Sequence, residues 1–162
     1  MVTRLIKAIV PMVFLSVAGA AIAYHPGHYQ QFNDTTWCAG CDLSGAEMSG
    51  WIKTSASLEN SNLSRANMAL GNFAGTNFYN AIMAEAKLMH ANFAGASLVN
   101  ANLSNANLTH AVLANADLSN AHFNGANLSQ ANLLRTNFDG WQQQSAGSVC
   151  HALLPDGSRG AC

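Results

Sequence analysis

From position 41 to position 140 the chain repeats every five residues, and this period decides most of what it can fold into. The central residue is large and apolar in nineteen of the twenty units, as eleven Leu, five Phe and three Met; Lys53 is the exception. At about 100° per residue, a helix would turn successive centres by roughly 140° and spread them over every face. A straight strand would send alternate centres to opposite faces, because its side-chain period is two. The chain must therefore bend the same way in every unit and coil into a solenoid.

The first and second positions of the unit are also restricted. Fourteen of the twenty first positions are Ala, and twelve of the second positions are Asn or Asp. Ala suits a narrow interior, whereas Asn and Asp suit repeated bends because they accept unusual backbone angles and hydrogen-bond locally. The unit at 101–105, Ala-Asn-Leu-Ser-Asn, shows the whole pattern. In these residues the chain resembles the pentapeptide-repeat family.

This resemblance implies an all-β fold, a right-handed quadrilateral β-helix in which each unit forms one side. Twenty units would make about five coils, so residues twenty apart stack on consecutive coils, as Arg65 and Glu85 would in a surface ion pair. The open ends of such a solenoid need caps, because exposed edges recruit other β-edges. We therefore expect a signal peptide at 1–23, an N-terminal cap at 24–40, the β-solenoid at 41–140 and a C-terminal cap at 141–162.

The first 23 residues have the composition of a secretory signal. Arg4 and Lys7 precede an apolar run that ends in Ala-Ile-Ala, which predicts cleavage before Tyr24. The run is short for a membrane span and contains Pro11, and no Cys follows the cleavage point to accept a lipid. We expect a periplasmic or secreted protein with no stable membrane anchor after signal cleavage.

The charge of the mature chain argues against a nucleic-acid partner. Without the two basic residues of the signal, five basic residues remain against eight acidic ones, a formal charge of −3. Nucleic-acid sites need a basic patch, so we expect no nucleic acid to bind. Some members of the resembled family mimic DNA and inhibit gyrase, but such mimicry needs a strongly acidic surface and access to the cytoplasm. A DNA-mimic gyrase inhibitor is the least favoured alternative function.

All four cysteines lie at the ends of the repeat, Cys38 and Cys41 at its entrance and Cys150 and Cys162 beyond its exit. Four thiols in an exported chain predict two disulfides, for which three connectivities are possible. Five coils would separate the Cα atoms of any end-to-end pair by more than the roughly 7 Å that a disulfide spans. The pairs Cys38–Cys41 and Cys150–Cys162 remain, which places one disulfide in each cap.

The sequence Trp-Cys-Ala-Gly-Cys that ends at Cys41 is also similar to the redox motif of thioredoxins. There, a helix N-terminus lowers the pKa of the first thiol and activates it. Here no helical pattern follows Cys41, which holds the small inward position of the first unit. A structural clip is therefore favoured, and a thiol-disulfide oxidoreductase using Cys38 and Cys41 is the first alternative.

The ends of the solenoid carry residues that depart from the repeat. Trp37, Trp51 and Trp141 all lie near the ends, and we expect them to cover the core. Lys53 holds a central position in the first coil, where a charge cannot stay buried without a partner. Either Ile52 is buried in its place, with the pattern back in register one unit later, or the Lys53 side chain reaches out of the open end. We expect the first arrangement.

Stacking also brings His90 and His110 to the same outward position on consecutive coils. Their imidazoles could share a metal ion, although two ligands fall short of the four that zinc normally takes. His25 and His28 could bind copper together with the new terminal amine. A metal-binding protein is the second alternative, and we expect no cofactor.

One side of the solenoid is flat, small and almost uncharged in its outward positions. No Ser, His and acid combination has catalytic spacing and no Gly-rich phosphate loop is present, so we expect no enzyme. We expect instead a structural or protein-interaction module that docks an unknown protein partner, or a second copy of itself, through this side. The candidate docking positions are Asn72, Ala74, Asn92, Ala94, Val112, Ala114 and Leu134.

Overall fold

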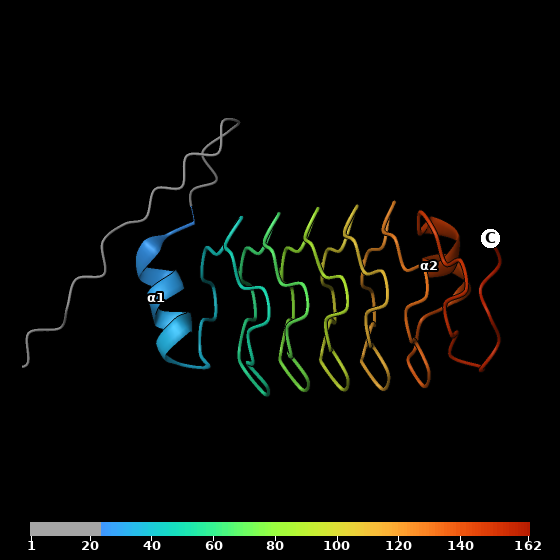
Figure 1. Ribbon diagram of the computed structural model, residues 1–162, viewed down its shortest axis with the longest axis horizontal. Helices are drawn as coiled ribbons and strands as arrows, with labels where there is room; N and C mark the ends of the chain where they lie inside the picture. Colours follow the sequence, from blue (N-terminus) through green and yellow to red (C-terminus); the bar gives the residue numbers. More distant parts are fainter. Residues whose placement is uncertain (1–23) are drawn as a thin grey trace, which may run out of the picture.

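The computed structural model describes residues 24–162, and the expected signal peptide at 1–23 lies outside the described residues. A long solenoid runs between two short helices, α1 (Pro26–Asp34) and α2 (Gly140–Ser145) (Figure 1). Residues twenty apart pair through single parallel β-bridges, as Asp42 does with Asn62 and Asn62 with Ile82. Each five-residue unit therefore forms one of four sides, and the prediction of about five four-sided coils is confirmed.

We name the sides by the units of the first coil: side A is 41–45, side B is 46–50, side C is 51–55 and side D is 56–60, and each recurs twenty residues later. The coils are joined by backbone hydrogen bonds along the axis of the solenoid. On side A, for example, the Leu63 N–H donates to the carbonyl of Ile82 on the following coil at 2.7 Å, and the Asn62 N–H donates to the carbonyl of Cys41 on the preceding coil at 2.8 Å. Each inner coil is thus bonded on both of its edges.

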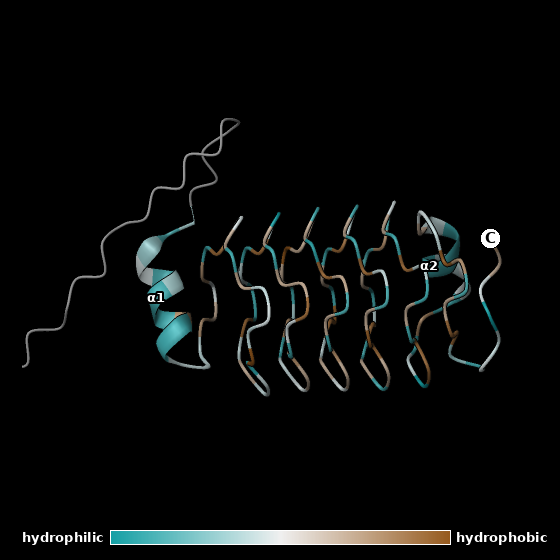
Figure 2. Cartoon of the chain, viewed as in Figure 1, coloured by the Kyte–Doolittle hydropathy of each residue, from teal (hydrophilic) through white to brown (hydrophobic). Residues whose placement is uncertain are grey.

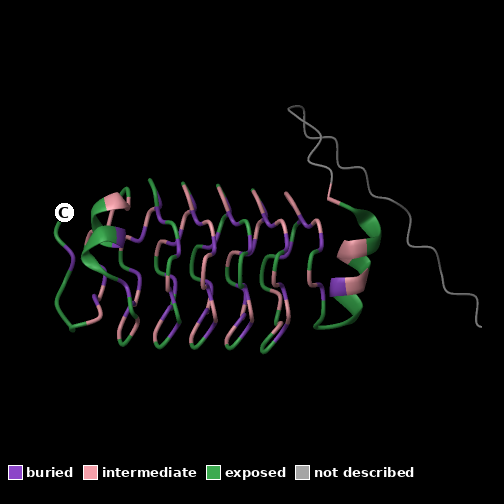
Figure 3. Ribbon diagram, turned by 180° about the vertical axis from the view of Figure 1, so that it is seen from behind, coloured by how far each residue is buried: buried purple, intermediate pink, exposed green. Residues whose placement is uncertain are grey.

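The core lies along the axis of the solenoid and is filled by the first and central residues of the units. Every central residue from Leu58 to Leu133 is at most 1% exposed. Apolar and polar segments accordingly alternate along every coil (Figure 2), and buried segments alternate with exposed corners (Figure 3). Three rings, Phe73, Phe78 and Phe93, form a cluster with centroids 5.6 to 6.1 Å apart.

Two local devices make the repeated bends. From unit 41–45 to unit 131–135, the fifth residue always adopts a left-handed backbone conformation, with φ between +53° and +71°. Gly and Asn tolerate this conformation best, and they hold most of these positions. The second-position Asn supplies the other device, because its side-chain oxygen accepts a hydrogen bond from the backbone two residues later. The Ala94 N–H, for example, donates to Oδ1 of Asn92 at 3.0 Å. The expected role of Asn in the bends is therefore confirmed.

At the N-terminal end, α1 covers the core. Pro26 occupies the first turn of the helix, where its missing N–H costs nothing, and Phe32 is the buried residue, 0% exposed. The expectation that the tryptophans cover the ends is wrong for Trp37 and Trp141, which are 59% and 77% exposed. Trp37 pairs with Ser57 in an outward second position. Of the three tryptophans, only Trp51 packs on the core, against Phe32 with ring centroids 6.0 Å apart.

The expected shift of register at Lys53 is also wrong. Ile52 is 74% exposed, and Lys53 keeps the central position and its backbone bond to the next coil. The Lys53 side chain instead reaches into the N-terminal cap, where Nζ donates to the carbonyls of Asn33 at 2.9 Å and Thr35 at 2.7 Å. These carbonyls lie at the C-terminal end of α1, where a cation is favourable because the last carbonyls have no partner in the helix. The charge is thus satisfied without a shift.

At the C-terminal end, α2 interrupts the repeat and the coil then resumes. Asp139 caps α2 through its carboxylate, which accepts from the Gln142 N–H at 2.8 Å. Beyond the helix, Ser148 and Leu153 pair in parallel with Asn127 and Asn132 of the fifth coil. The chain then turns back, and its last residues form an antiparallel bridge between Leu153 and Arg159. This hairpin covers part of the edge that the last coil would otherwise expose.

Candidate functional site

Both predicted disulfides are present. Cys38 and Cys41 are joined with Cα atoms 5.3 Å apart, and Cys150 and Cys162 are joined with Cα atoms 4.4 Å apart. Cys38 and Cys41 are 0% and 3% exposed, and Cys41 is followed by the first coil of the solenoid, not by a helix. The helix-activated geometry of a redox motif is therefore not reproduced at this pair.

The structure brings the predicted docking positions together on side C, and we call this surface the side-C face. Its second-position row runs along the solenoid through consecutive parallel bridges, and Asn92 donates to the side chain of Asn72 at 3.1 Å. Its fourth-position row is aligned by backbone bonds such as that from the Gly75 N–H to the Ala94 carbonyl at 2.9 Å. The rows are Ile52, Asn72, Asn92, Val112 and Asn132, and Thr54, Ala74, Ala94, Ala114 and Leu134.

The stacked position predicted for His90 and His110 lies at the corner at which side B turns into side C, and sequence reasoning did not connect this corner with the docking side. From the second coil onward, the fifth residues of side B form what we call the border ridge: Leu70, His90, His110 and Gln130. Leu70 has φ of +61° and is 67% exposed. Its N–H donates to the carbonyl of Met89 at 2.9 Å, and the Met89 side chain is also exposed. The signal in the sequence was a Leu at a position that Gly and Asn usually fill.

The histidines considered as metal ligands lie in two places. On the border ridge, the rings of His90 and His110 stack at a centroid distance of 4.6 Å with 7° between their planes. Parallel rings direct their ring nitrogens side by side, so they do not converge on one ion in this arrangement. His25 and His28 serve the N-terminal cap: Nδ1 of His28 accepts from the Asp42 N–H at 3.0 Å.

Two charged features lie outside the side-C face. Arg65 and Glu85 form the expected surface pair, with two hydrogen bonds of 2.9 and 3.2 Å. On side D, Oδ1 of Asp117 accepts from the Ser119 hydroxyl at 2.7 Å, the Ser119 N–H at 3.0 Å and the Asn137 amide at 2.8 Å. The Ser119 hydroxyl bond is the largest of the causes that lower the pKa of Asp117 below its ordinary value of 3.8.

We expect Asp117→Asn to remove part of the acid sensitivity of the fold. Because the pKa of Asp117 is lowered by folding, its carboxylate stabilises the protein above pH 3.8, and this contribution is lost as the pH falls through the folded pKa. At neutral pH the variant should stay within about 0.5 kcal/mol of the wild type, since Asn62 makes the same bonds to Ser64. Urea unfolding at pH 7 and pH 3 measures both quantities, and an unchanged difference between the two pH values would contradict the prediction.

A small hollow of about 210 Å³ lies beside α2. Its polar groups are largely occupied by the cap: Asp139 caps the helix, and the Gln142 side chain donates to the carbonyls of Leu118 and Ala121 at 2.7 and 3.1 Å. The sequence did not indicate this hollow. Its lining residues are Asn120, Ala121, His122, Asp139, Trp141 and Gln142.

Comparison with known proteins identifies the repeat. The family model described as pentapeptide repeats matches residues 54–84, 86–125 and 106–140 in eight copies. A pentapeptide repeat protein from the thylakoid lumen of Arabidopsis thaliana is 29% identical, with 70% of this chain and 77% of that chain covered and a TM-score of 0.62. The right-handed β-helix implied by the sequence resemblance is thereby confirmed.

Two further solved structures are similar. HetL, a pentapeptide repeat protein involved in heterocyst differentiation regulation in Nostoc sp. strain PCC 7120, is 27% identical over 67% of this chain and 49% of its own, with a TM-score of 0.31. Another pentapeptide repeat protein of Nostoc PCC 7120 is 22% identical over 70% of this chain and 84% of its own, with a TM-score of 0.46. No curated protein matches the chain.

Proposed function

Because the chain belongs to the pentapeptide-repeat family, whose repeats build a structural module, we propose that it is a non-enzymatic protein-interaction module that works outside the cytoplasm. It binds a protein partner through the side-C face and the adjoining border ridge. The partner is a separate protein or a second copy of the chain, and the experiment below separates these two cases.

The observation that carries this proposal is Leu70. A left-handed backbone costs a residue with a Cβ roughly 1–2 kcal/mol, and Gly or Asn would avoid most of that cost. An exposed Leu also contributes nothing to the core, since its side chain is 67% exposed. Leu70 thus carries two costs, a strained backbone and an apolar side chain exposed to water. A role in binding explains both, because contact with a partner would bury the side chain.

The surroundings of Leu70 extend this surface. Among residues 24–162, eight large apolar side chains are exposed, and four of them, Ile52, Leu70, Met89 and Val112, lie on side C or at the end of side B. These four side chains supply the large anchors that the Ala and Asn residues of the side-C face cannot provide, since binding energy usually concentrates in large side chains. The rows of the side-C face carry no charged side chain, which suits the centre of a protein interface.

Several observations support a location in the periplasm or outside the cell. Two disulfides are typical of an oxidising compartment. Neither α1 nor α2, nor any other helix within 24–162, has the length and apolar run that crossing a membrane requires. A similar protein of known structure comes from a lumen, that of the thylakoid. Together with the composition of residues 1–23, the disulfides and this similarity support export.

In-cell photo-crosslinking tests the proposal. A photoreactive residue at Ala94, in the middle of the side-C face, is compared with one at Ser119 on side D, both in the full chain. A distinct protein trapped only from position 94 supports a binding module, and a second copy trapped only from position 94 supports self-association. Capture from neither position, or equal capture from both, overturns the docking role of the face.

We expect Leu70→Asn to stabilise the protein while weakening partner binding. Asn accepts the left-handed conformation, so the free energy of unfolding should rise by about 1 kcal/mol. Capture from position 94 should fall, because the largest exposed apolar group of the border ridge is gone. Ile82→Asn is the matched control, since it removes an exposed apolar side chain from side A, at a second position where Asn is common. Unchanged capture in Leu70→Asn, or an equal loss in both variants, would contradict the prediction.

A further inference from the structure

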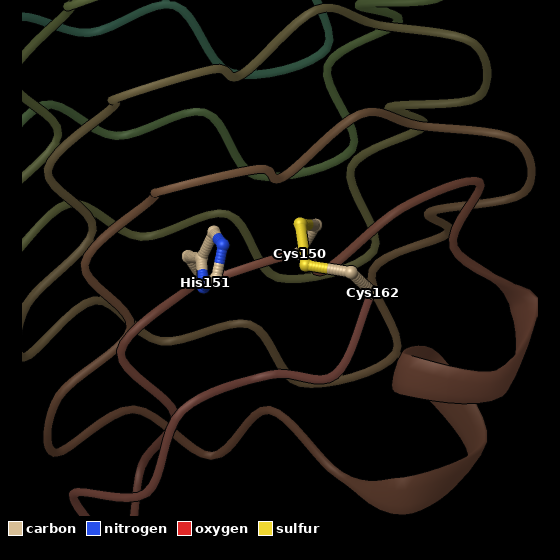
Figure 4. Close-up of side chains that lie close together, drawn as sticks. All are labelled: Cys150, His151 and Cys162. Carbon is tan, nitrogen blue, oxygen red and sulfur yellow. A yellow bond between two sulfur atoms is a disulfide. The ribbon is translucent and has the colours of Figure 1, made fainter.

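The C-terminal cap brings three metal-ligating side chains together. The Sγ atoms of Cys150 and Cys162 and a ring nitrogen of His151 all lie within 4.8 Å of one another. Figure 4 shows the imidazole of His151 beside the disulfide that joins the two cysteines. Two thiolates and an imidazole are the ligands that zinc and other thiophilic cations prefer, and three of them leave one tetrahedral position for water. In the oxidised chain the disulfide uses both sulfurs, so only the reduced chain offers this ligand set.

Backbone contacts hold the three residues together independently of the disulfide. The His151 N–H donates to the Gly160 carbonyl at 3.0 Å, and the Gly160 N–H donates to the Ala152 carbonyl at 2.9 Å. The Arg159 guanidinium adds a bond of 3.0 Å to the carbonyl of His151. Cys162 is only two residues beyond Gly160, so opening the disulfide leaves the two thiols near each other. The site is therefore largely preorganised by the terminal hairpin, which lowers the cost of binding an ion.

The two disulfides differ in their access to reagents and in their surroundings. Cys38 and Cys41 are buried in the core, whereas Cys162 is exposed and Cys150 is partly exposed. Thiol–disulfide exchange requires access to a sulfur atom, so the C-terminal bond is the one open to attack. Among residues 24–162, the C-terminal group is also the one set of three His, Cys, Asp or Glu side chains placed to hold a cation. The N-terminal disulfide thus serves as an internal control for reduction and for metal binding.

We propose that the C-terminal clip is a redox-controlled metal site, in which a dithiol reductant opens the disulfide and Cys150, His151 and Cys162 then bind a zinc-like divalent cation. One thiolate of the reductant attacks Sγ of Cys162 and releases the sulfur of Cys150. The second thiol of the reductant closes its own disulfide and frees Cys162. Two electrons pass to the protein, and the two cysteine protons are released when the metal binds. This role is independent of the side-C face.

Cobalt(II) titration of the folded chain tests the proposal. The protein is reduced with a phosphine, which carries no thiol that competes for the metal, and alkylation with mass spectrometry establishes which disulfide has opened. The reduced chain should bind one Co²⁺ with a thiolate-to-cobalt charge-transfer band, which zinc displaces, and the oxidised chain should not. His151→Asn should weaken binding by about ten-fold or more, because one of three ligands is lost. Asn suits the left-handed φ of +57° at this position, so the fold should persist.

Two further variants make the outcome decisive. His122→Asn removes another exposed histidine and should leave cobalt binding unchanged. The double variant Cys38→Ser with Cys41→Ser should also bind as the wild type does, because those sulfurs lie outside the site. Failure of the reduced wild type to bind cobalt, or equal affinity in His151→Asn and the wild type, overturns the proposal even if a cysteine variant does not fold.

Discussion

Phe93→Ala is expected to lower the free energy of unfolding by about 3–5 kcal/mol, the usual loss for a large buried ring. Phe93 is 1% exposed, and its ring stacks on Phe73 at 5.8 Å and meets Phe78 edge-on at 5.6 Å. These neighbours are themselves packed between coils whose backbones are bonded on both edges, so they cannot collapse into the space that the ring leaves. The loss is measured by urea unfolding followed by circular dichroism.

Leu103→Ala is the matched control for the aromatic cluster. It removes a fully buried central residue on the following coil that carries no ring of its own, and it should cost about 2–5 kcal/mol. The Phe93 variant should exceed it, because ring pairs add about 0.5–1.5 kcal/mol beyond burial. In a solenoid each coil stabilises its neighbours, so a weak middle coil should also broaden the unfolding transition. A loss below about 1 kcal/mol in Phe93→Ala would mean that the surrounding coils relax into the cavity.

The regular part of this fold was predictable from sequence because one physical rule is applied at every unit. A central residue must point inward, a small residue must precede it, and a bend must follow, so a period of five requires a solenoid. The four sides of each coil were implied by the family resemblance. The disulfide pairs followed from the same rule, since the length of the solenoid forbids the other pairings. The positions of the side-C face depend only on the spacing of twenty residues, so they were predictable once the family resemblance implied four units per coil.

The ends were not predictable in this way, because there the partner of each side chain is not another coil. Lys53 could be placed only once α1 was known to present free carbonyls at Asn33 and Thr35. The helix α2 did carry a signal, since Asp139 and Gln142 have capping-box spacing. Phe138, which is buried at the expected central position, continues the five-residue pattern up to the helix, so this capping signal was not recognised. By inserting α2, the chain changes the pairing distance from twenty to twenty-one residues, so the unit that starts at Ala152 was missed.

The stacking along the border ridge was predictable, but its strain was not, because the fifth position is defined by its backbone and not by its side chain. Gly and Asn are common there, but Leu70, His90 and His110 adopt the same left-handed conformation. A period alone assigns these residues to a corner without showing that the corner is strained. The strain becomes visible only with the backbone angles, and it is this strain that separates Leu70 from an ordinary exposed side chain.

Gly71→Ala is expected to destabilise the protein by about 1–3 kcal/mol, although it restores the commonest first residue of the repeat. Gly71 lies outside the left-handed region, and at such a position Gly→Ala normally stabilises by about 0.4–1 kcal/mol. Here a Cβ would collide with the ring of Phe73, at Cε2 and, at 3.1 Å, at Cζ, and would lie 3.0 Å from the Met68 carbonyl. The ring cannot swing away, because Phe78 and Phe93 pack against it.

The same change in a Phe73→Leu background separates this collision from any intrinsic effect of Ala. With the ring gone, the unit becomes Ala-Asn-Leu, the pattern found at 101–103, and Gly71→Ala should be neutral or stabilising. The two substitutions touch each other, so a coupling of about 0.5–3 kcal/mol is expected in the double-mutant cycle. An equal penalty in both backgrounds would place the cost in the backbone instead. We therefore infer that Gly71 is required by Phe73, because the interior at this position has room for the ring in this orientation or for the methyl group of Ala, but not for both.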